Sequence, residues 1–224
     1  EMMIPVVAER LDGGTPWHPH HIAERYGLLV IITLGEVILG TILAISAVIE
    51  EHGWTVQAGV VAFGGTALAF ALWWTYFTMP SGEVLARHRE RGFVWGYGHM
   101  LIFGSLAATG AGLHVSASAI RGEGHINETT AILTLVIPVA IFMLCLFALY
   151  SSLLRQIDLL HVLLLGGSLL ALALAVAAVL NGASIGTGIL LTVCSPVIVV
   201  IGFETVGHRR QAATLTRVLG PSRD

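Results

Sequence analysis

Six long apolar stretches, separated by short polar connections, organise the chain. They run from Ile22 to Ile49, Trp54 to Met79, Phe93 to Ile120, Thr129 to Leu154, Leu159 to Leu180 and Ala183 to Val206. Each has the roughly 20 residues that an α-helix needs to cross the hydrocarbon core of a bilayer. Helices are favoured because, in lipid, each backbone polar group has to be satisfied within its own segment. The pattern predicts about six membrane-spanning helices.

The composition indicates the same class of protein. Hydrophobic residues make up 55% of the 224 residues, charged residues only 11%, and the mean hydropathy is +0.84. Soluble domains carry about 25% charged residues, and a soluble globule of this size has no room to bury so much apolar surface. We therefore expect an all-α fold, a polytopic transmembrane helix bundle whose main partner is the lipid bilayer.

The basic residues predict how the bundle is oriented. All eleven are arginines, and the alternate connections divide them ten against one, with only Arg121 on the poorer side. The arginine-rich side is predicted to be cytoplasmic. Both termini then lie in the cytoplasm, as an even number of crossings requires. We expect an N-terminal cytoplasmic or interfacial segment over residues 1–21, a six-helix transmembrane domain over 22–207 and a cytoplasmic tail over 208–224.

One acid, Glu36, lies deep inside the first apolar stretch. It is 14 residues into that segment, or about 21 Å along a helix axis, which places it near mid-membrane. A charged group there costs about 2.5–3.5 kcal/mol on insertion scales. At 100° per residue, His21, Arg25 and Glu36 fall on one stripe, with Leu29 and Ile32 between them. We expect this stripe to face protein or water and not lipid.

Glu36 needs a partner, because Arg25 lies about 16 Å away along the axis. The candidates on other helices are Tyr97, His99 and His114 in the third helix and His161 in the fifth. Under the functional interpretation Glu36 lines a polar path and binds a proton or cation. Under the structural one, it is a protonated or hydrogen-bonded glutamate that joins two helices. Glu24 lies about 100° off the stripe and is a further pathway candidate.

Other polar residues have simpler interpretations. Glu204 is expected to form an interfacial ion pair with His208 and Arg209. His18, His20, His21 and Glu24 offer donors for a metal, but Pro16 and Pro19 interrupt them and no zinc-protease motif is present, so neither a metal nor a cofactor is predicted.

The connection with Arg87, Arg89 and Arg91 is either a solvated loop helix or a patch for lipid headgroups or a protein partner. The two cysteines, Cys145 and Cys194, are expected to be small buried hydrophobic residues.

Two aromatic segments are predicted to lie at the cytoplasmic level of the bilayer. LWWTYF covers Leu72 to Phe77, and FVWGYGH covers Phe93 to His99. They form either an interfacial belt or a shared aromatic pocket. Basic clusters with interleaved aromatics are absent, so nucleic-acid binding has no support, and no nucleophile elbow, phosphate loop or catalytic carboxylate pair supports an enzyme.

The stretch HIAERYGLLVIITLGEVILG, residues 21–40, resembles the signature of the bacterial low-temperature-requirement A (LtrA) family. The matching residues are His21, Glu24, Arg25, Tyr26, Gly27, Leu28, Leu34, Gly35 and Glu36. LWWTYF and the YGH of FVWGYGHML also fit, so the ordered motifs cover residues 18 to 120. The resemblance implies a multi-pass protein of the bacterial cytoplasmic membrane. Family members are longer, so we expect either a missing N-terminal half or a homo-oligomer.

Three functional hypotheses follow. The first is a transporter or channel-like protein with a proton- or cation-linked site at mid-membrane, built on Glu36, Arg25 and His21, with His99 and His114 as relay groups. The second is a non-transporting membrane scaffold or sensor involved in low-temperature adaptation, in which the same residues hold helices together and the three loop arginines bind a partner. A membrane-embedded enzyme is the weakest hypothesis.

Overall fold

The computed structural model describes residues 4, 7, 17–123, 126–154 and 158–212 of the chain. Within them, six helices are long and apolar enough to cross a membrane. These are α2 (Pro19–His52), α3 (Val56–Phe77), α5 (Gly92–Ile120), α6 (Glu128–Leu154), α7 (Leu159–Leu180) and α8 (Ile185–Gly202). Three short elements complete the described fold: α4 (Ser81–Arg87), the 3₁₀ turn η1 (Arg89–Arg91) and the π-helical stretch η2 (Phe203–Gly207). The expected all-α bundle with six long apolar helices is confirmed.

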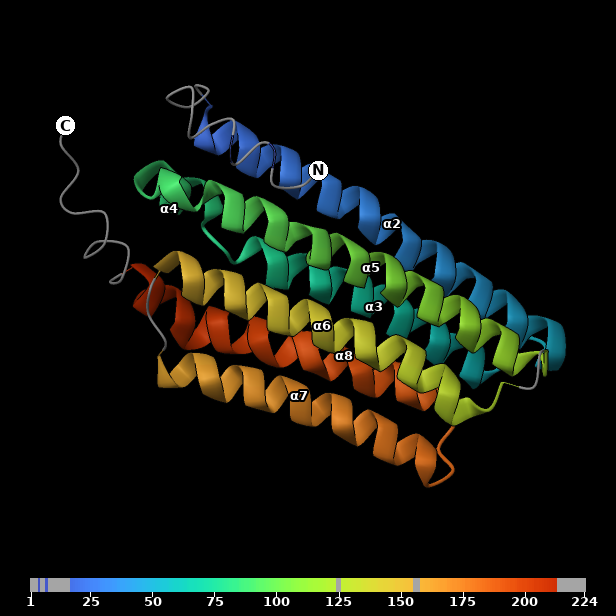
Figure 1. The fold of residues 1–224 in the computed structure, drawn as a ribbon. Coiled ribbons are helices and arrows are strands. Elements are labelled where there is room, and N and C mark those ends of the chain that lie inside the picture. The colour runs from blue at the N-terminus through green and yellow to red at the C-terminus, as the bar shows by residue number, and fades with distance from the viewer. Residues whose placement is uncertain (1–3, 5–6, 8–16, 124–125, 155–157, 213–224) are drawn as a thin grey trace.

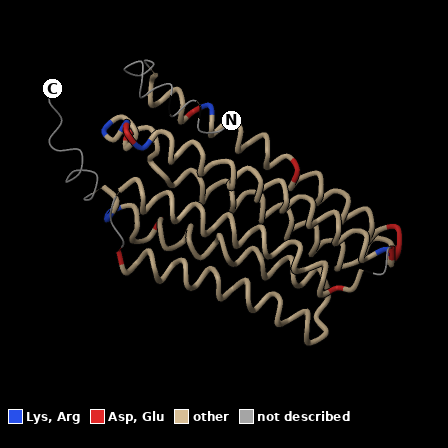
Figure 2. The backbone as a smooth tube through the Cα atoms, in the orientation of Figure 1, with Lys and Arg blue, Asp and Glu red and all other residues tan. Residues whose placement is uncertain are grey.

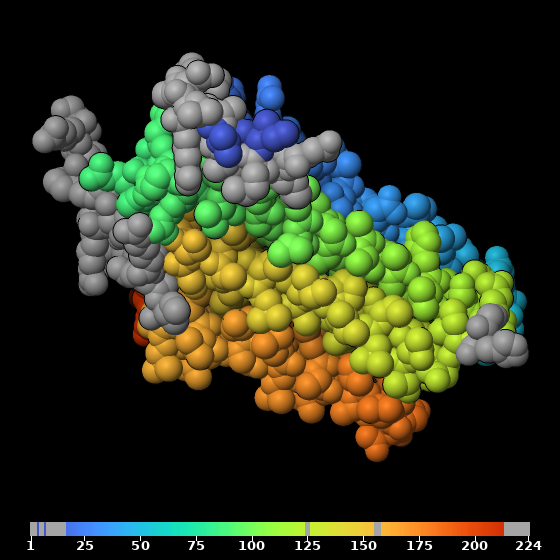
Figure 3. All heavy atoms as spheres, viewed as in Figure 1, coloured from blue at the N-terminus to red at the C-terminus, as the bar shows by residue number. Residues whose placement is uncertain are grey.

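The six long helices form a closed, flattened ring. Around it each helix packs against the next in the order α2, α5, α6, α7, α8 and α3, and α3 returns to α2. In Figure 1, α2 forms the upper edge and α7 the lower edge, while α5 and α6 lie in front of α3 and α8. The space-filling view shows α5 and α6 packed into one surface between these two edges (Figure 3). The two edge helices therefore have the largest outward faces.

Short connections join the helices at both ends of the bundle. At one end, the connections use glycines with positive φ, Gly53, Gly122 and Gly182, a conformation that glycine adopts without steric penalty. At the other end lie α4, η1 and the start of α2. The start of α7 contacts the segment that follows α8 at this end as well. Local caps support these breaks: Thr55, Asp158 and Ser184 each accept a hydrogen bond from the first turn of the helix that follows.

Apart from Glu36 on α2, the described charged residues collect at the two ends of the bundle (Figure 2). One end carries Arg25, Arg87, Arg89, Arg91, Arg209 and Arg210, and we call it the arginine-rich end. The opposite end carries Glu50, Glu51, Glu123 and Glu128, with Arg121. A long apolar belt lies between them, as a bilayer requires. Which end is cytoplasmic stays a prediction, as does the division of the chain at residues 21 and 207.

The bundle interior is apolar and closely packed. Trp95, Phe142, Leu68 and Ile102 are among its largest fully buried side chains. Cys145 is half-buried, as a small hydrophobic residue in a helix interface would be, but Cys194 faces outward from α8. The expectation that both cysteines are buried is therefore wrong for Cys194, because apolar residues in lipid have no reason to avoid the outer surface of a bundle.

Candidate functional site

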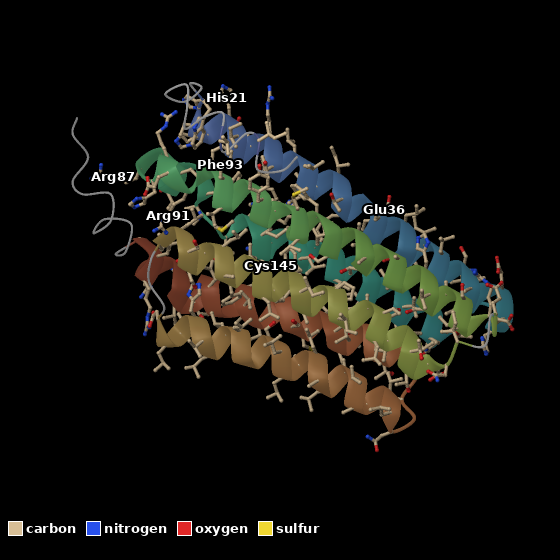
Figure 4. All side chains as sticks on the ribbon, in the orientation of Figure 1. His21, Glu36, Arg87, Arg91, Phe93 and Cys145 are labelled. Atoms are coloured by element: carbon tan, nitrogen blue, oxygen red, sulfur yellow. The ribbon has the colours of Figure 1, made fainter. Side chains whose placement is uncertain are left out.

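Glu36 lies midway along α2, the helix at the edge of the bundle (Figure 4). Its side chain is exposed, and no described residue forms a hydrogen bond or ion pair with it. Its backbone, in contrast, is tightly packed: a Cβ added to Gly110 of α5 would fall 2.6 Å from the Glu36 carbonyl oxygen. The α2 and α5 backbones thus touch at Glu36, while its carboxyl group points out of the described bundle.

The predicted stripe of α2 lies on the same outward side as Glu36. His21, Arg25, Leu29 and Ile32 are all exposed, with Ile32 at 70%. Glu24 is exposed as well, and its carboxylate lies 3.5 Å from His21 Nδ1. We call this surface the outer face of α2; its exposed residues are His21, Glu24, Arg25, Leu28, Leu29, Ile32, Gly35, Glu36 and Leu39. The described chain itself does not cover this face.

His99 belongs to a different environment, a buried aromatic cluster in the half of the bundle nearer the arginine-rich end. Its Nδ1 lies 2.7 Å from the Trp95 carbonyl oxygen, and its Nε2 lies 3.0 Å from the Tyr76 hydroxyl. Because a carbonyl oxygen only accepts, Nδ1 carries the proton and Nε2 accepts from Tyr76. The rings of Tyr26 and Phe103 lie 5.0 and 5.7 Å from the His99 ring. These five residues are the aromatic cluster.

The aromatic cluster joins the three sequence motifs into one structure. Tyr26 comes from the α2 motif, Tyr76 from LWWTYF of α3, and Trp95 and His99 from FVWGYGH of α5. The two aromatic segments therefore pack against each other in one buried cluster. Trp95 Nε1 is buried there without a hydrogen-bond partner among the described residues. Sequence reasoning named His99 but missed Tyr76, whose place next to it depends on the packing of α3 against α5.

His114 lies at the α2–α5 crossing, close to the level of Glu36. A Cβ added to Gly40 would fall 3.0 Å from a ring carbon of His114. His114 follows Gly110, which touches Glu36, by one helical turn, whereas His99 precedes Gly110 by 11 residues, or about 16 Å along the axis. The Nε2 atom of His114 is buried with no hydrogen-bond partner in the described chain. The structure thus places His114, and not His99, nearest to Glu36 among the candidate groups.

The three loop arginines differ in their contacts. Arg89 donates a hydrogen bond to the Trp17 carbonyl oxygen, and its guanidinium lies 4.9 Å from the centre of the Trp17 ring. Arg91 Nε lies 3.9 Å from Glu90, and Arg87 has no ion pair with a described residue. Arg89 therefore fixes the start of α2 against η1, while Arg87 is free on the surface.

Tyr97 lies in a shallow groove at the same end of the bundle. The groove is also lined by Trp17, Tyr26, Arg89 and Phe93. Tyr97 and Phe93 stack with their ring centres 6.1 Å apart. The structure thus separates the candidates into three places: Tyr97 in this groove, His99 in the aromatic cluster, and Glu36 with His114 at the α2–α5 crossing.

Comparison with known families agrees with this arrangement of motifs. The family model described as "Bacterial low temperature requirement A protein (LtrA)" matches residues 1–200. The chain belongs to the LtrA family. The match extends well beyond the motifs at 18–120 that carry the resemblance, into α6, α7 and most of α8. No curated protein and no solved structure gives a significant match. This LtrA chain is therefore a bacterial multi-pass membrane protein whose bundle has to be interpreted from its own contacts.

A small pocket, lined mainly by apolar side chains with a few polar ones, lies at the arginine-rich end of the LtrA bundle, among α3, α6, α7 and α8. It encloses about 80 Å³, enough for a few water molecules and too little for a drug-sized ligand. Arg210 Nη1 donates to Asp158 at 2.9 Å across it, and this hydrogen bond lowers the pKa of Asp158. The candidate His161 lines this pocket, stacked on Tyr150 with ring centres 4.2 Å apart. His161 is thus remote from the α2–α5 crossing.

Glu204 does not form the expected ion pair. Its Oε1 accepts a hydrogen bond from Trp74 Nε1 at 3.0 Å, and His208 Nδ1 lies 3.3 Å from the Phe203 carbonyl oxygen. The cause is η2: a π-helical turn has more residues per turn than an α-helix, so His208 no longer lies directly above Glu204. Within the described residues, no group of three or more His, Cys, Asp or Glu side chains is placed to hold a metal ion.

Proposed function

We propose that this LtrA-family protein moves protons or cations across the bacterial cytoplasmic membrane, through a polar site built around Glu36. The observation that carries the proposal is the position of this carboxyl group: midway along a 34-residue apolar helix, exposed on its outer face and without a described partner. Acidic residues in membrane spans are rare because they are costly, and they mark ion pathways and proton relays. The other acids of the described chain lie nearer the helix ends.

In this proposal Glu36 alternates between two charge states. The bare carboxylate costs about 2.5–3.5 kcal/mol at mid-membrane, so it either holds a proton or binds a cation. Release of either one leaves a charge that the next proton or cation neutralises. His114, one turn beyond the Gly110 contact, supplies a buried imidazole nitrogen without a described partner. Because an imidazole can take up a proton at one ring nitrogen and give one up at the other, His114 is the proposed relay between Glu36 and the opposite end of the bundle.

The remaining candidates have supporting roles in the proposal. His21, Glu24 and Arg25 lie on the same outer face as Glu36 at the arginine-rich end, where they would attract or repel ions entering the path. His99 has both ring nitrogens engaged, one by Trp95 and one by Tyr76. We therefore assign His99 and the aromatic cluster to positioning α2, α3 and α5. Tyr97 lines the groove at the entrance side.

A scaffold or sensor is the second candidate function, and the exposed Arg87 favours it. Arg87 and Arg89 are exposed beside the start of α2, and the largely buried Arg91 adds a third positive charge behind them. Such a surface suits anionic lipid headgroups or an acidic protein segment. In that case, a change in the bilayer or the partner would be the signal, and Glu36 would take no part in moving ions.

Flux measurement separates the two functions. The full-length protein, its Glu36→Gln variant and a Glu204→Gln control are reconstituted into proteoliposomes, and proton and monovalent-cation flux is followed. The control makes the same change of acid to amide near the end of α8, on a residue outside the proposed path. We expect flux in the wild type and the control, and at least tenfold less in folded Glu36→Gln. Absence of flux in all three, across common cations and a pH gradient, would favour the scaffold or sensor.

A further inference from the structure

The outer face of α2 differs from the other large outward face of the bundle. On α7, the exposed residues along the helix are apolar, among them Val162, Leu163, Leu170 and Leu174. Such a face suits lipid tails. The outer face of α2 carries Glu36 at mid-membrane and Glu24 and Arg25 at the arginine-rich end. Because lipid tails offer Glu36 no partner, a protein surface against the outer face of α2 is favoured over lipid.

We propose that a second copy of this chain covers the outer face of α2, so that the Glu36 site is completed at a two-fold interface. Only the role of Glu36 in this interface rests on the proposed function. The interface itself follows from the residues on the surface of α2. In a membrane, two copies with the same orientation are related by an axis along the membrane normal. Each residue of α2 then meets α2 of the second copy at its own depth.

The angular positions on α2 show which residues meet. At 100° per residue, Leu28, Ile32 and Leu39 lie within about 20° of a common line, and all three are exposed, at 59%, 70% and 47%. Glu24 lies about 60° to one side of this line, and Arg25 lies about 40° to the other side. The three apolar residues would form the seam of the interface, with the two charged residues flanking it.

Two-fold symmetry then makes the charges complementary. A residue on one side of the seam meets a residue from the other side of the second copy. Arg25 of each copy therefore lies opposite Glu24 of the other, which forms two reciprocal ion pairs. Within one chain, Arg25 has no described ion-pair partner, and Glu24 contacts only the exposed His21. The outer face of α2 is thus complementary to itself.

The same symmetry encloses Glu36. Gly35 lies about 20° from Glu24 around the helix, and Glu36 about 20° from Arg25, so Glu36 of each copy faces Gly35 of the other. A Cβ added to Gly35 would meet nothing within 4 Å in the single chain, so this position leaves room for an approaching side chain. Both carboxyl groups would then lie at one depth between the two α2 helices, shielded from lipid tails, where a proton or a cation can neutralise them.

Disulfide cross-linking in native membranes tests the interface directly. Cys145 and Cys194 are first replaced by alanine in the full-length protein. Single cysteines are then placed at the seam (Leu28→Cys, Ile32→Cys and Leu39→Cys), with Leu170→Cys on α7 as the control of similar exposure and apolar character. We expect the seam variants to give a covalent dimer on mild oxidation and the control to stay monomeric. Absence of the dimer, equal cross-linking of the control, or cross-linking to a different polypeptide would each overturn the proposal.

Charge exchange tests the reciprocal pairs. Glu24→Arg and Arg25→Glu each place like charges across the interface, and we expect each to lower the association constant of the dimer in bilayers several-fold to about tenfold. The double variant restores both ion pairs with reversed sign, so its association constant should lie within about twofold of the wild-type value. Failure of the double variant to recover would contradict the pairing.

The interface and the proposed function fail in different ways. Cross-linking without any ion flux would retain the interface and reject the transport function. Glu36-dependent flux from a chain that never cross-links would retain the function and reject the two-fold site. We expect Glu36→Gln to lose flux and to keep the Ile32→Cys cross-link, because an amide fits the same space as the carboxyl group.

Discussion

At the scale of single residues, the hydrogen bond between Tyr76 and His99 has a measurable stability effect. Both side chains are buried, and the hydroxyl donates to Nε2 at 3.0 Å. Tyr76→Phe removes the donor and leaves the His99 Nε2 acceptor unsatisfied in an apolar interior. We expect a loss of about 1–3 kcal/mol of stability, measured as a lower unfolding temperature of the purified protein in detergent.

Tyr26→Phe is the matched control for this hydrogen bond. Tyr26 belongs to the same aromatic cluster, with its ring 5.0 Å from that of His99, but its hydroxyl has no hydrogen bond to a described residue. This variant keeps the ring contacts, so its free energy of unfolding should lie within about 0.5 kcal/mol of the wild-type value. An equal loss of stability in the two variants would mean that the loss comes from ring packing and not from the bond to His99.

The ion pair between Asp158 and Arg210 gives a pH-dependent effect at the arginine-rich end. The hydrogen bond from Arg210 lowers the pKa of Asp158 below its ordinary value of 3.8. The pair therefore stabilises the fold above that value, and its contribution disappears as the pH falls through the lowered pKa. Because both side chains are about half exposed, solvent screening keeps the contribution below about 1 kcal/mol.

We expect Asp158→Asn to unfold at a slightly lower temperature than the wild type at neutral pH. Asparagine still caps α7, so only the ion pair is lost. The difference should vanish in acid below the lowered pKa, when Asp158 itself is protonated. Unfolding temperatures measured across the pH range test this, and a difference that persists unchanged in acid would argue for a capping effect.

The sequence predicts which residues are unusual better than it predicts what they contact. Glu36 is recognisable because an acid in an apolar run is costly wherever the helix packs. Its direction out of the bundle depends on the side of α2 that meets α5, which follows from the fit of Gly40 and Gly110. The partner of Glu204 was predicted incorrectly for a similar reason. Spacing rules assume a regular α-helix, and η2 changes the spacing at that point.

At the scale of helices, the crossing of α2 and α5 depends on two glycines. A Cβ on Gly110 would lie 2.6 Å from the Glu36 backbone, and one on Gly40 would lie 2.5 Å from the Gly110 carbonyl oxygen. Real Cβ atoms do not approach backbone so closely, so Gly110→Ala has to push the helices apart. We expect it to destabilise the bundle by about 1–3 kcal/mol, measured by thermal unfolding in detergent.

Gly104→Ala is the control on the same helix. Gly104 lies on the exposed side of α5, and a Cβ there would meet nothing within 4 Å. Alanine also favours a helix over glycine, so this variant should be as stable as the wild type or slightly more so. If both variants lost stability equally, helix propensity or detergent contacts would explain the result and the α2–α5 contact would not.

Helix boundaries were predictable to within a few residues, because they follow from local chemistry. The predicted fifth helix, Leu159 to Leu180, coincides with α7, which Asp158 caps at its start. The predicted first and sixth helices differ by a few residues: α2 begins at Pro19, and α8 passes into η2 after Gly202. The second difference arises inside an apolar run, where hydropathy gives no signal for a change from α- to π-helical hydrogen bonding.

At the scale of the whole molecule, the ring order α2, α5, α6, α7, α8 and α3 was beyond prediction from hydropathy. An apolar residue is equally suited to lipid or to a neighbouring helix, so the pattern does not tell which faces pack. The short connections restrict which helices are neighbours but leave the placement of α3 beside α8 undetermined. That contact follows from side-chain fits, such as Gly64 of α3 against Ile189 of α8.

The orientation of the bundle in the membrane, in contrast, can be predicted from the distribution of arginines over the whole molecule. Of the described arginines, only Arg121 lies at the end opposite the arginine-rich end. Because basic loops are retained in the cytoplasm, we expect the connection at η1 to face the cytoplasm and the connection between α2 and α3 to face outward. The test places single cysteines, Glu90→Cys or Glu51→Cys, in a chain whose native cysteines have been replaced. Labelling of each cysteine by a membrane-impermeant maleimide shows on which side of the membrane that end of the bundle lies.

We expect intact cells to label Glu51→Cys and to protect Glu90→Cys until the membrane is opened. Both positions are exposed in the structure, so protection would reflect the membrane and not burial. Labelling of Glu90→Cys alone in intact cells would invert the bundle and place Arg25 and the start of the outer face of α2 outside. Under the proposed function, ions would then meet His21, Glu24 and Arg25 from the external side. The side from which the proposed path would load Glu36 therefore follows from this measurement.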